Sequence, residues 1–291
     1  MNNELAERLI KISIDNPLLP ETFIPWEDEL GLNDVYLPPY LVSLYDTPFF
    51  ETLTLFQKTE LAKREACQVM YAYAWSETLF CQFITRRLLT IDPAGWEHKF
   101  LLRELIEECR HQEMFTRAIE KLNVKAITPG FWHRFFGNFT VKLMPHDAVF
   151  MSCLAVELMA EIYAAHYRKA DNVYIVLKKV SQLHHIEEAR HILFTEELLK
   201  DYTMKAGFVK RTWYSTLVML NIYFMRTMYV KKEIFSAIGI SDPKVYKMAQ
   251  KNFKKNFGIH CLGKSIEFVQ GFNGFNSITR PLWRIFLNAH V

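Results

Sequence analysis

The sequence predicts an all-α protein built around a four-helix bundle, with additional helices before and after it. Half of the 291 residues are hydrophobic, and only ten glycines and eleven prolines interrupt the chain. Long stretches repeat their apolar residues at the spacing of a helix, and alternating β-branched runs are few. Four of these stretches each carry a glutamate among apolar residues, where an uncompensated charge is costly. Together these observations favour a helical bundle with a polar interior site.

The first 48 residues are expected to be irregular with short helical pieces. Residues 25–48 are rich in prolines and aromatic side chains. This composition predicts an ordered segment wrapped over a core rather than a free tail. From about Thr59 to Leu89 the helical pattern is uninterrupted, so this stretch is predicted to be the first bundle helix.

The second bundle helix is predicted to begin at Asp92 and Pro93 and to run to about Leu122. Aspartate is a favoured N-cap residue, and proline is favoured in the first helical turn. Residues 128–130 (Thr-Pro-Gly) then break the pattern. The aromatic stretch 131–139 that follows is interpreted as a connector.

The third bundle helix is predicted to start near Asp147 and the fourth to cover residues 173–200, with a turn at Asp171 and Asn172 between them. Further helices are expected at 209–237, 243–257 and 262–270, the middle one opened by a second Asp-Pro pair. We expect a single domain over residues 1–291, with a bundle core at about 50–200 and a C-terminal helical extension at about 205–291.

Two Glu-x-x-His pairs are the most informative feature of the chain. They are Glu108 with His111 and Glu188 with His191. Residues three apart share one face of a helix, so each pair can present a carboxylate and an imidazole to the same point. With lone glutamates on the two other bundle helices, the order becomes Glu, Glu-x-x-His, Glu, Glu-x-x-His. A four-helix bundle uses this order to hold two metal ions.

The lone glutamates are Glu77 and Glu157. Glu161 competes with Glu157, because it lies one turn further along the same helix. His184 shares a face with Glu188 and His191, since residues four and seven apart lie one and two turns away, whereas His185 does not share it. Inward carboxylates without inward Lys or Arg would repel one another unless cations neutralised them.

The ligand arrangement of dinuclear sites in four-helix bundles suggests a role for each candidate ligand. Glu108 and Glu188 suit bridging positions, His111 and His191 would each bind one ion, and Glu77 and Glu157 would be terminal, although spacing alone does not separate bridging from terminal carboxylates. His184 would make one ion richer in nitrogen. Neighbouring charged residues could orient the imidazoles or form solvent-facing ion pairs, and both interpretations stay open for them: Glu107, Glu187, Arg110 and Arg190.

The net charge of +3 conceals an uneven distribution. From Lys205 onward there are fourteen Lys and Arg against three Asp and Glu, whereas the preceding residues carry 21 basic and 29 acidic side chains. In the predicted helix 243–257, Lys244, Lys247, Lys251 and Lys254 share one side. This side is interpreted as a solvated face or as a docking surface for an anionic partner, such as a carrier protein or a nucleic acid.

Targeting signals and common catalytic motifs are missing from the sequence. The five cysteines are scattered and are expected to be reduced thiols of a cytoplasmic protein. No signal peptide is expected at the start, and the apolar stretch 213–224 is too short to span a membrane and should form a buried helix. The chain contains no glycine-rich phosphate loop, Gly-x-Ser-x-Gly elbow, His-Glu-x-x-His motif or paired Cys-x-x-Cys.

The ligand pattern Glu77, Glu108-x-x-His111, Glu157, His184-x-x-x-Glu188-x-x-His191 resembles that of the ferritin-like di-iron N-oxygenases typified by p-aminobenzoate N-oxygenase. The segment from Pro38 through Tyr45-Asp46-Thr47-Pro48 is similar as well. The resemblance covers residues 20–230 approximately. It implies a ferritin-like fold, two iron ions, dioxygen as co-substrate, an external electron donor, and oxidation of arylamines to hydroxylamines and nitro compounds. It carries over no substrate-binding residue.

Two other functions stay open at this point. One is a di-iron C–H hydroxylase or desaturase, and the other is a non-enzymatic iron-binding or storage protein. The chain has over a hundred residues beyond a minimal bundle, many of them aromatic or methionine and suited to lining a pocket for a small-molecule substrate. This favours an enzyme, which we also expect to be a homodimer without a membrane span.

Overall fold

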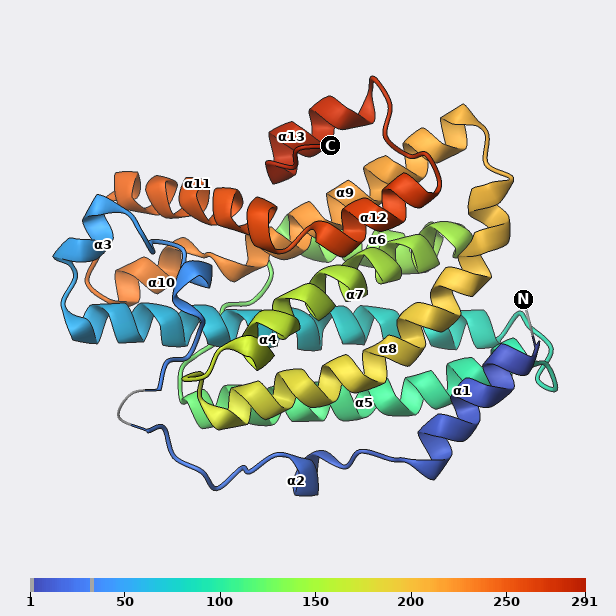
Figure 1. Cartoon of the computed structure of the whole chain (residues 1–291), viewed down its shortest axis with the longest axis horizontal. Helices are drawn as coiled ribbons and strands as arrows, with labels where there is room; N and C mark the ends of the chain where they lie inside the picture. Colours follow the sequence, from blue (N-terminus) through green and yellow to red (C-terminus); the bar gives the residue numbers. More distant parts are fainter. Residues whose placement is uncertain (1–2, 32–33) are drawn as a thin grey trace.

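The computed structural model describes residues 3–31 and 34–291, and within them the protein is all-α, as the sequence predicts (Figure 1). Four long helices form the bundle: α4 (Leu55–Leu88), α5 (Trp96–Leu122), α7 (His146–Lys169) and α8 (Ile175–Met204). Helix α4 packs on α5, α7 packs on α8, and α5 also contacts α8. The polar faces of all four therefore meet in the interior.

Local capping sets the ends of α4 and α5. Thr54 and Gln57 form a capping box that starts α4, each accepting from the other's backbone N–H. The predicted N-cap at Asp92 is wrong, because Asp92 closes a turn with its own side chain accepting from the Ala94 N–H, and α5 begins only at Trp96. Helix α5 ends at Leu122 as predicted, where Asn123 adopts a left-handed conformation.

The N-terminal segment wraps over the bundle, as expected. Helix α1 (Asn3–Asp15) packs on α5 and α8, and the short helices α2 (Pro20–Phe23), η1 (Pro39–Leu41) and α3 (Pro48–Thr52) follow it. Between them, buried side chains such as Trp26 and Leu44 anchor the chain. Val35 also pairs with the residues just before α8, accepting from Tyr174 N–H and donating to Asn172 O.

The predicted connector at 131–139 is instead part of a helix, α6 (Phe131–Leu143). It packs on α4 at Gly137, where a Cβ atom would lie only 2.7 Å from Leu79 and 2.8 Å from Trp75. A glycine is therefore needed for the two helices to approach this closely. Several aromatic side chains of α6 are exposed, including Phe131 and Trp132.

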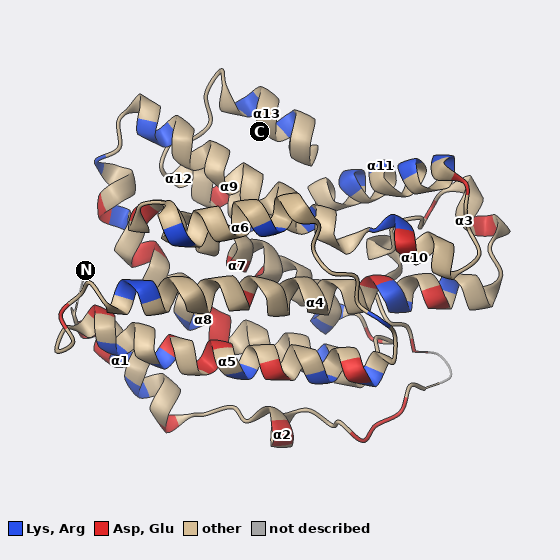
Figure 2. Cartoon of the chain, turned by 180° about the vertical axis from the view of Figure 1, so that it is seen from behind, with Lys and Arg blue, Asp and Glu red and all other residues tan. Residues whose placement is uncertain are grey.

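The C-terminal helices cover the opposite side of the bundle from α1 and α2 (Figure 1). They are α9 (Phe208–Tyr229), α10 (Lys232–Ala237), α11 (Pro243–His260), α12 (Gly263–Gly271) and α13 (Thr279–Leu287). The helix predicted at 209–237 is broken at Val230 and Lys231, and α13 was not predicted. Asp242 caps α11 as predicted, since its side chain accepts from Lys244 N–H. Lysines follow one side of α11 (Figure 2).

Two apolar helices of the structure, α9 and α7, contribute to the core. The stretch 213–224 lies in the helix α9, as predicted, and half of its twelve residues are buried, while Trp213 is 46% exposed. Among the described residues, α7 is the one helix long and apolar enough to cross a membrane by length and composition. Most of its apolar stretch is buried inside the protein, which is typical of a core helix.

Candidate metal centre

The seven residues predicted from the sequence all lie in the interior between the four bundle helices. Helix α4 supplies Glu77, α5 supplies Glu108 and His111, α7 supplies Glu157, and α8 supplies His184, Glu188 and His191. None of the seven residues is more than 8% exposed. The spacing of three and four residues along α5 and α8 turns each set toward the same point.

Glu108 and Glu188 each face two histidines with their two carboxylate oxygens. Glu108 Oε2 lies 3.0 Å from His111 Nδ1, and its Oε1 lies 3.1 Å from His191 Nδ1. Glu188 repeats this arrangement, with Oε1 3.3 Å from His111 Nδ1 and Oε2 3.4 Å from His191 Nδ1. Donor atoms at right angles about 2.1 Å from a first-row metal ion are about 3 Å apart. Both carboxylates are thus placed to bridge two ion positions.

The first ion position lies beside His111, His184 and Glu77. His184 Nε2 is 3.1 Å from Glu188 Oε1 and 3.4 Å from Glu77 Oε1. The ring of Tyr73 stacks on His184 at a centroid distance of 5.8 Å and limits its rotation. This position therefore offers two imidazole nitrogens, in agreement with the expected nitrogen-rich ion.

The second ion position lies beside His191 and is richer in carboxylates. Glu104 Oε1 is 3.9 Å from His191 Nδ1, and Glu104, Glu108 and His191 form one of three buried groups whose donor atoms could hold an ion. Glu157 is buried beside this position, with neither oxygen hydrogen-bonded. Our sequence analysis missed Glu104, although its spacing to Glu108 and His111 repeats that of His184 to Glu188 and His191.

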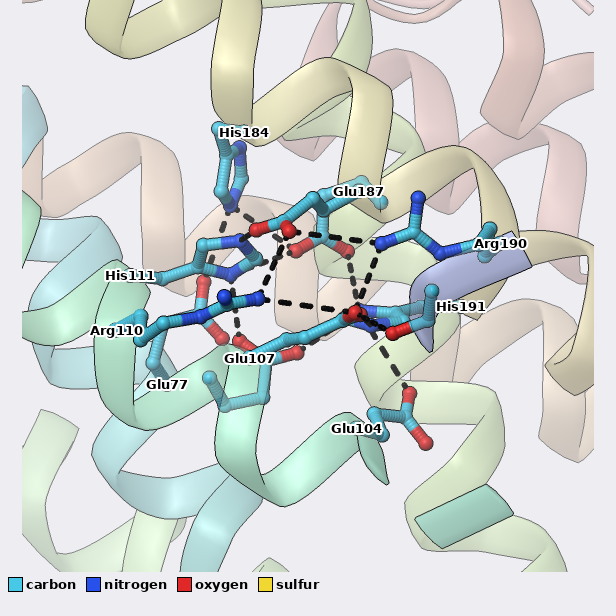
Figure 3. Close-up of polar contacts among 12 residues, drawn as sticks. Glu77, Glu104, Glu107, Arg110, His111, His184, Glu187, Arg190 and His191 are labelled. Atoms are coloured by element: carbon cyan, nitrogen blue, oxygen red, sulfur yellow. Dashed lines mark hydrogen bonds and ion pairs between the residues drawn. The ribbon is translucent and has the colours of Figure 1, made fainter. Parts of the chain in front are cut away.

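A symmetrical network of ion pairs holds the two Glu-x-x-His histidines (Figure 3). His111 Nε2 donates to Glu187 Oε2 at 2.9 Å, and Arg110 donates to the other oxygen of Glu187. In mirrored fashion, His191 Nε2 donates to Glu107 Oε2 at 2.8 Å, and Arg190 donates to Glu107. Each histidine is thus oriented by a glutamate from the opposite helix, which fixes the proton on Nε2 and leaves Nδ1 free to bind metal.

Helix α1 supports one side of this network. Ser13 Oγ donates to Glu107 Oε1, and Arg103 donates to Ser13. Ser13 is buried at 2% exposure, so water does not replace this contact. The role of Ser13 was missed in the sequence, because α1 lies about ninety residues away along the chain and carries no motif.

Glu161 and His185, the alternatives to Glu157 and His184, pair with each other outside the site. His185 Nδ1 lies 2.8 Å from Glu161 Oε1, and Lys264 Nζ lies 2.8 Å from Glu161 Oε2. Glu161 is therefore paired with the cation of Lys264 and with His185, and it does not join the site. Of the two glutamates on α7, Glu157 is the one placed toward the candidate ion positions.

The electrostatics of the interior site require a positive species. Five carboxylates meet there, from Glu77, Glu104, Glu108, Glu157 and Glu188, and most of their oxygens are buried without a hydrogen-bond partner. Burial and then Glu108 raise the pKa of Glu77 to about 8, and burial raises the pKa of Glu104 to about 8. Without metal, such groups hold protons in place of ions. The donor set therefore fits two metal ions.

The pKa values of the histidines and of Glu108 also reflect the excess of carboxylates. Although burial opposes it, the neighbouring Glu188 raises the pKa of His184 to about 9. Burial and Glu188 act against ionisation of Glu108, yet hydrogen bonds with His111 and His191 hold the pKa of Glu108 at about 2. Metal ions would displace these protons from the histidines and glutamates together.

A cavity of about 220 Å³ reaches the first ion position from the side of α6 and α9. Its inner end is formed by Glu77, Glu157 and His184, and most of its remaining lining is apolar. Phe136 and Trp213, both partly exposed at the protein surface, also line it. A small molecule in this cavity would contact the candidate metal centre directly.

Comparison with known proteins identifies related sequences over most of the chain. The profile of the family described as p-aminobenzoate N-oxygenase AurF matches residues 1–268. An uncharacterised protein of Mycobacterium bovis is 24% identical over 254 residues, which cover 84% of this chain and 71% of the relative. An uncharacterised protein of Mycobacterium tuberculosis matches with the same identity and coverage.

Proposed function

This chain belongs to the p-aminobenzoate N-oxygenase AurF family, and from that premise we propose that it is a di-iron oxygenase that oxidises the nitrogen of a small amine. An arylamine is the first candidate substrate. The observation that carries the proposal is the placement of Glu108 and Glu188, each of which faces His111 and His191 with opposite oxygens. Bridging carboxylates of this kind hold two ions close together in bundle di-iron proteins.

We assign the donors to two positions. His111, His184 and Glu77 would bind the first iron, and His191, Glu157 and the additional Glu104 would bind the second. The two bridging glutamates complete both sets. Carboxylate-rich sites of this kind suit iron better than zinc, which prefers four tetrahedral ligands and more nitrogen or sulfur.

The protein side chains position and protect the reaction, while the bound irons would supply dioxygen activation and oxygen transfer. Glu107 and Glu187 keep the imidazoles oriented by accepting from Nε2. A substrate bound in the cavity would have its nitrogen beside Glu77, Glu157 and His184, which line it. Its apolar walls exclude water and so favour transfer to the bound amine over unproductive loss of the oxidant. The electrons would come from an external donor.

The cavity favours an enzyme over an iron-storage protein. Storage needs a path for many ions and a space for mineral, whereas this cavity is small, apolar and closed at its inner end by three candidate ligands. The same cavity is compatible with oxidation at carbon, so the chemistry of the product has to be measured. A di-iron hydroxylase or desaturase would share the metal centre and differ in the atom that is oxidised.

The test is single-turnover oxidation by iron-loaded, chemically reduced protein. We expect oxygen-dependent conversion of an arylamine to its hydroxylamine or nitro product, detected by mass spectrometry with ¹⁸O₂, while the two irons stay bound. Glu108→Ala should abolish it, whereas Glu161→Gln, whose side chain pairs with His185 and Lys264 outside the site, should retain the iron. Uptake of many irons per chain without product would contradict the proposal, and oxygen insertion at carbon would restrict it to the oxygenase class.

A further inference from the structure

The cavity beside the candidate metal centre has no Lys or Arg from residues 3–31 and 34–291 in its wall. It is formed by α4, α6, α7 and α9. Its ionisable carboxylates are Glu77 and Glu157, which we have assigned to the metal ions. Most of the remaining surface comes from aromatic and aliphatic side chains such as Phe80, Leu217 and Phe224.

Three polar side chains of the wall donate to the backbone of their own helix. Ser76 donates to Tyr73 O, Ser152 donates to Ala148 O, and Asn221 donates to Leu217 O. All three hydrogen bonds are made to the preceding turn of the residue's own helix. The donors that remain in the wall are neutral groups, so a carboxylate in this largely apolar site would have no Lys or Arg to offset its desolvation.

Apart from the candidate metal ligands, two wall residues carry a buried polar atom without a hydrogen-bond partner, namely the Tyr73 hydroxyl and His133 Nδ1. The Tyr73 hydroxyl is a neutral donor, whereas the free atom of His133 accepts hydrogen bonds. The Thr227 hydroxyl donates to Phe224 O, so His133 Nε2 donates to Thr227 Oγ1 at 3.0 Å. Burial, and the nearby Lys231, lower the pKa of His133 to about 4, so the ring is neutral at neutral pH. Its buried Nδ1, which has no partner, is then an acceptor. An acceptor suits an N–H or O–H group and repels a carboxylate.

Two cationic side chains near the wall, Arg86 and Lys231, do not line the cavity. Arg86 donates to Met144 O at 3.0 Å and lies against the face of Phe83. Lys231 lowers the pKa of His133 through its charge. Neither side chain contributes to the lining.

We infer that the cavity selects uncharged, largely apolar amines and discriminates against amines that carry a carboxylate, such as p-aminobenzoate. The inference rests on the proposed function, because it takes the cavity to be the substrate site. A buried carboxylate would lose its hydration and meet mostly apolar groups, a few neutral polar groups and the two acidic ligands, with no Lys or Arg to pair with. A neutral ring of the same size would bury the same apolar area without that loss.

The test compares p-aminobenzoate with its methyl ester, which keeps the same ring and amine but carries no charge. Binding to the iron-loaded protein is measured without reductant, through the fluorescence of Trp75 and Trp213 in the cavity wall and by calorimetry. The expected result is a Kd at least about tenfold lower for the ester, or about 1.4 kcal/mol. Equal or tighter binding of the acid would overturn the inference.

Two variants sharpen the test. Asn221→Lys places a cation in the wall and should improve binding of the acid about tenfold while leaving the ester little changed. Val209→Lys adds the same charge to the same helix at a position that is 80% exposed and outside the cavity, and should change neither. If instead Lys231→Met weakened binding of the acid and left binding of the ester unchanged, Lys231 would be the counterion of the acid and the inference would fail.

The binding and turnover results separate the two claims. Selective binding of the ester without any oxidised product leaves the inference standing and removes the proposed reaction. Oxidation of both amines with preference for the acid leaves the reaction standing and removes the inference.

Discussion

His184 and His185 are neighbours in the sequence, yet only the first faces the candidate irons. His184 lies against Glu77 and Glu188, whereas His185 pairs with Glu161. We therefore expect His184→Ala to lower the iron content or change the iron absorption spectrum, because it removes a donor atom from the first position. His185→Ala is the matched control and should leave both unchanged. Equal effects in both variants would show that His184 is not a ligand.

Glu104 gives a second prediction at the residue scale. Glu104→Gln removes a carboxylate from the second ion position without changing its volume, so the affinity for one of the two irons should fall about tenfold or more. Metal titration by calorimetry or chelator competition measures this. Glu113→Gln, which changes an exposed glutamate on the same helix, should have no effect. Unchanged affinity in Glu104→Gln would leave the second position to Glu157 and His191.

Glu65 offers a pH-dependent prediction away from the metal centre. Burial raises its pKa to about 8, against the hydrogen bond that it accepts from Ser43 N–H. The folded protein then keeps a proton that the unfolded chain releases near pH 4.5. Between these values the free energy of unfolding should fall as pH rises, by about 1.4 kcal/mol per pH unit. This contribution is fully present below pH 4.5 and is lost by about pH 8.

The comparison is made with Glu65→Gln, which can still accept from Ser43 but does not titrate. Denaturant unfolding of the metal-free proteins at pH 5 and pH 8 should show the variant gaining stability relative to the wild type at the higher pH. A difference between the two proteins that stays constant across this range would contradict a raised pKa.

The site residues that could be predicted are those whose placement depends on spacing within a single helix. Spacings of three, four and seven residues on one helix place Glu108, His111, Glu188 and His191 without any knowledge of the fold. The partners Glu107 and Glu187 could be named but not assigned, because each orients a histidine on the opposite helix. That depends on the register of α5 against α8, which the sequence does not display.

At the scale of elements, α1 acts as a support for the metal centre. Its Ser13 contacts Glu107, which in turn holds His191. Ser13→Ala should therefore lower iron affinity about tenfold, as loss of an outer hydrogen bond does in other metal sites, while leaving the fold intact. Ile14→Ala, at a side chain that is 57% exposed, is the control. Unaltered iron affinity in Ser13→Ala would show that Arg190 alone suffices to hold Glu107.

Helix α6 shows how the fold sets the cavity. Gly137 allows it to lie close to Leu79 and Trp75 of α4, and both of these side chains also line the cavity. We expect Gly137→Val to push these side chains inward and weaken binding of arylamines, with no change in iron content. Asn138→Ala, one residue along the helix, should leave binding unchanged. Loss of iron in Gly137→Val would instead indicate that α6 supports the metal centre.

Elements with strong caps and long periodic patterns were predictable, and short ones were not. The long helices α4, α5, α7 and α8 have periodic patterns over six or more turns, so their existence followed from the sequence. Helix α6 was mistaken for a connector because its aromatic residues are exposed to 40% or more, so they do not mark a buried face of a helix. Asp92 was mistaken for an N-cap because an Asp-Pro turn before a helix uses the same residues.

At the scale of the whole molecule, the two halves of the bundle repeat one another around the metal centre. Helices α4 and α5 supply Glu77, Glu104, Glu108 and His111, while α7 and α8 supply Glu157, His184, Glu188 and His191. The halves differ where Glu104 stands opposite His184. The difference makes one ion position richer in nitrogen and the other richer in oxygen, and the cavity opens beside the nitrogen-rich one.

The central claim is that this interior holds two irons bridged by Glu108 and Glu188. Anomalous diffraction at the iron absorption edge from crystals of the iron-loaded protein tests it most directly. The account predicts two anomalous peaks per chain, each within coordination distance of both bridging glutamates and of His111 or His191. A single peak with four tetrahedral ligands, or iron bound elsewhere while these glutamates remain protonated and free, would contradict it.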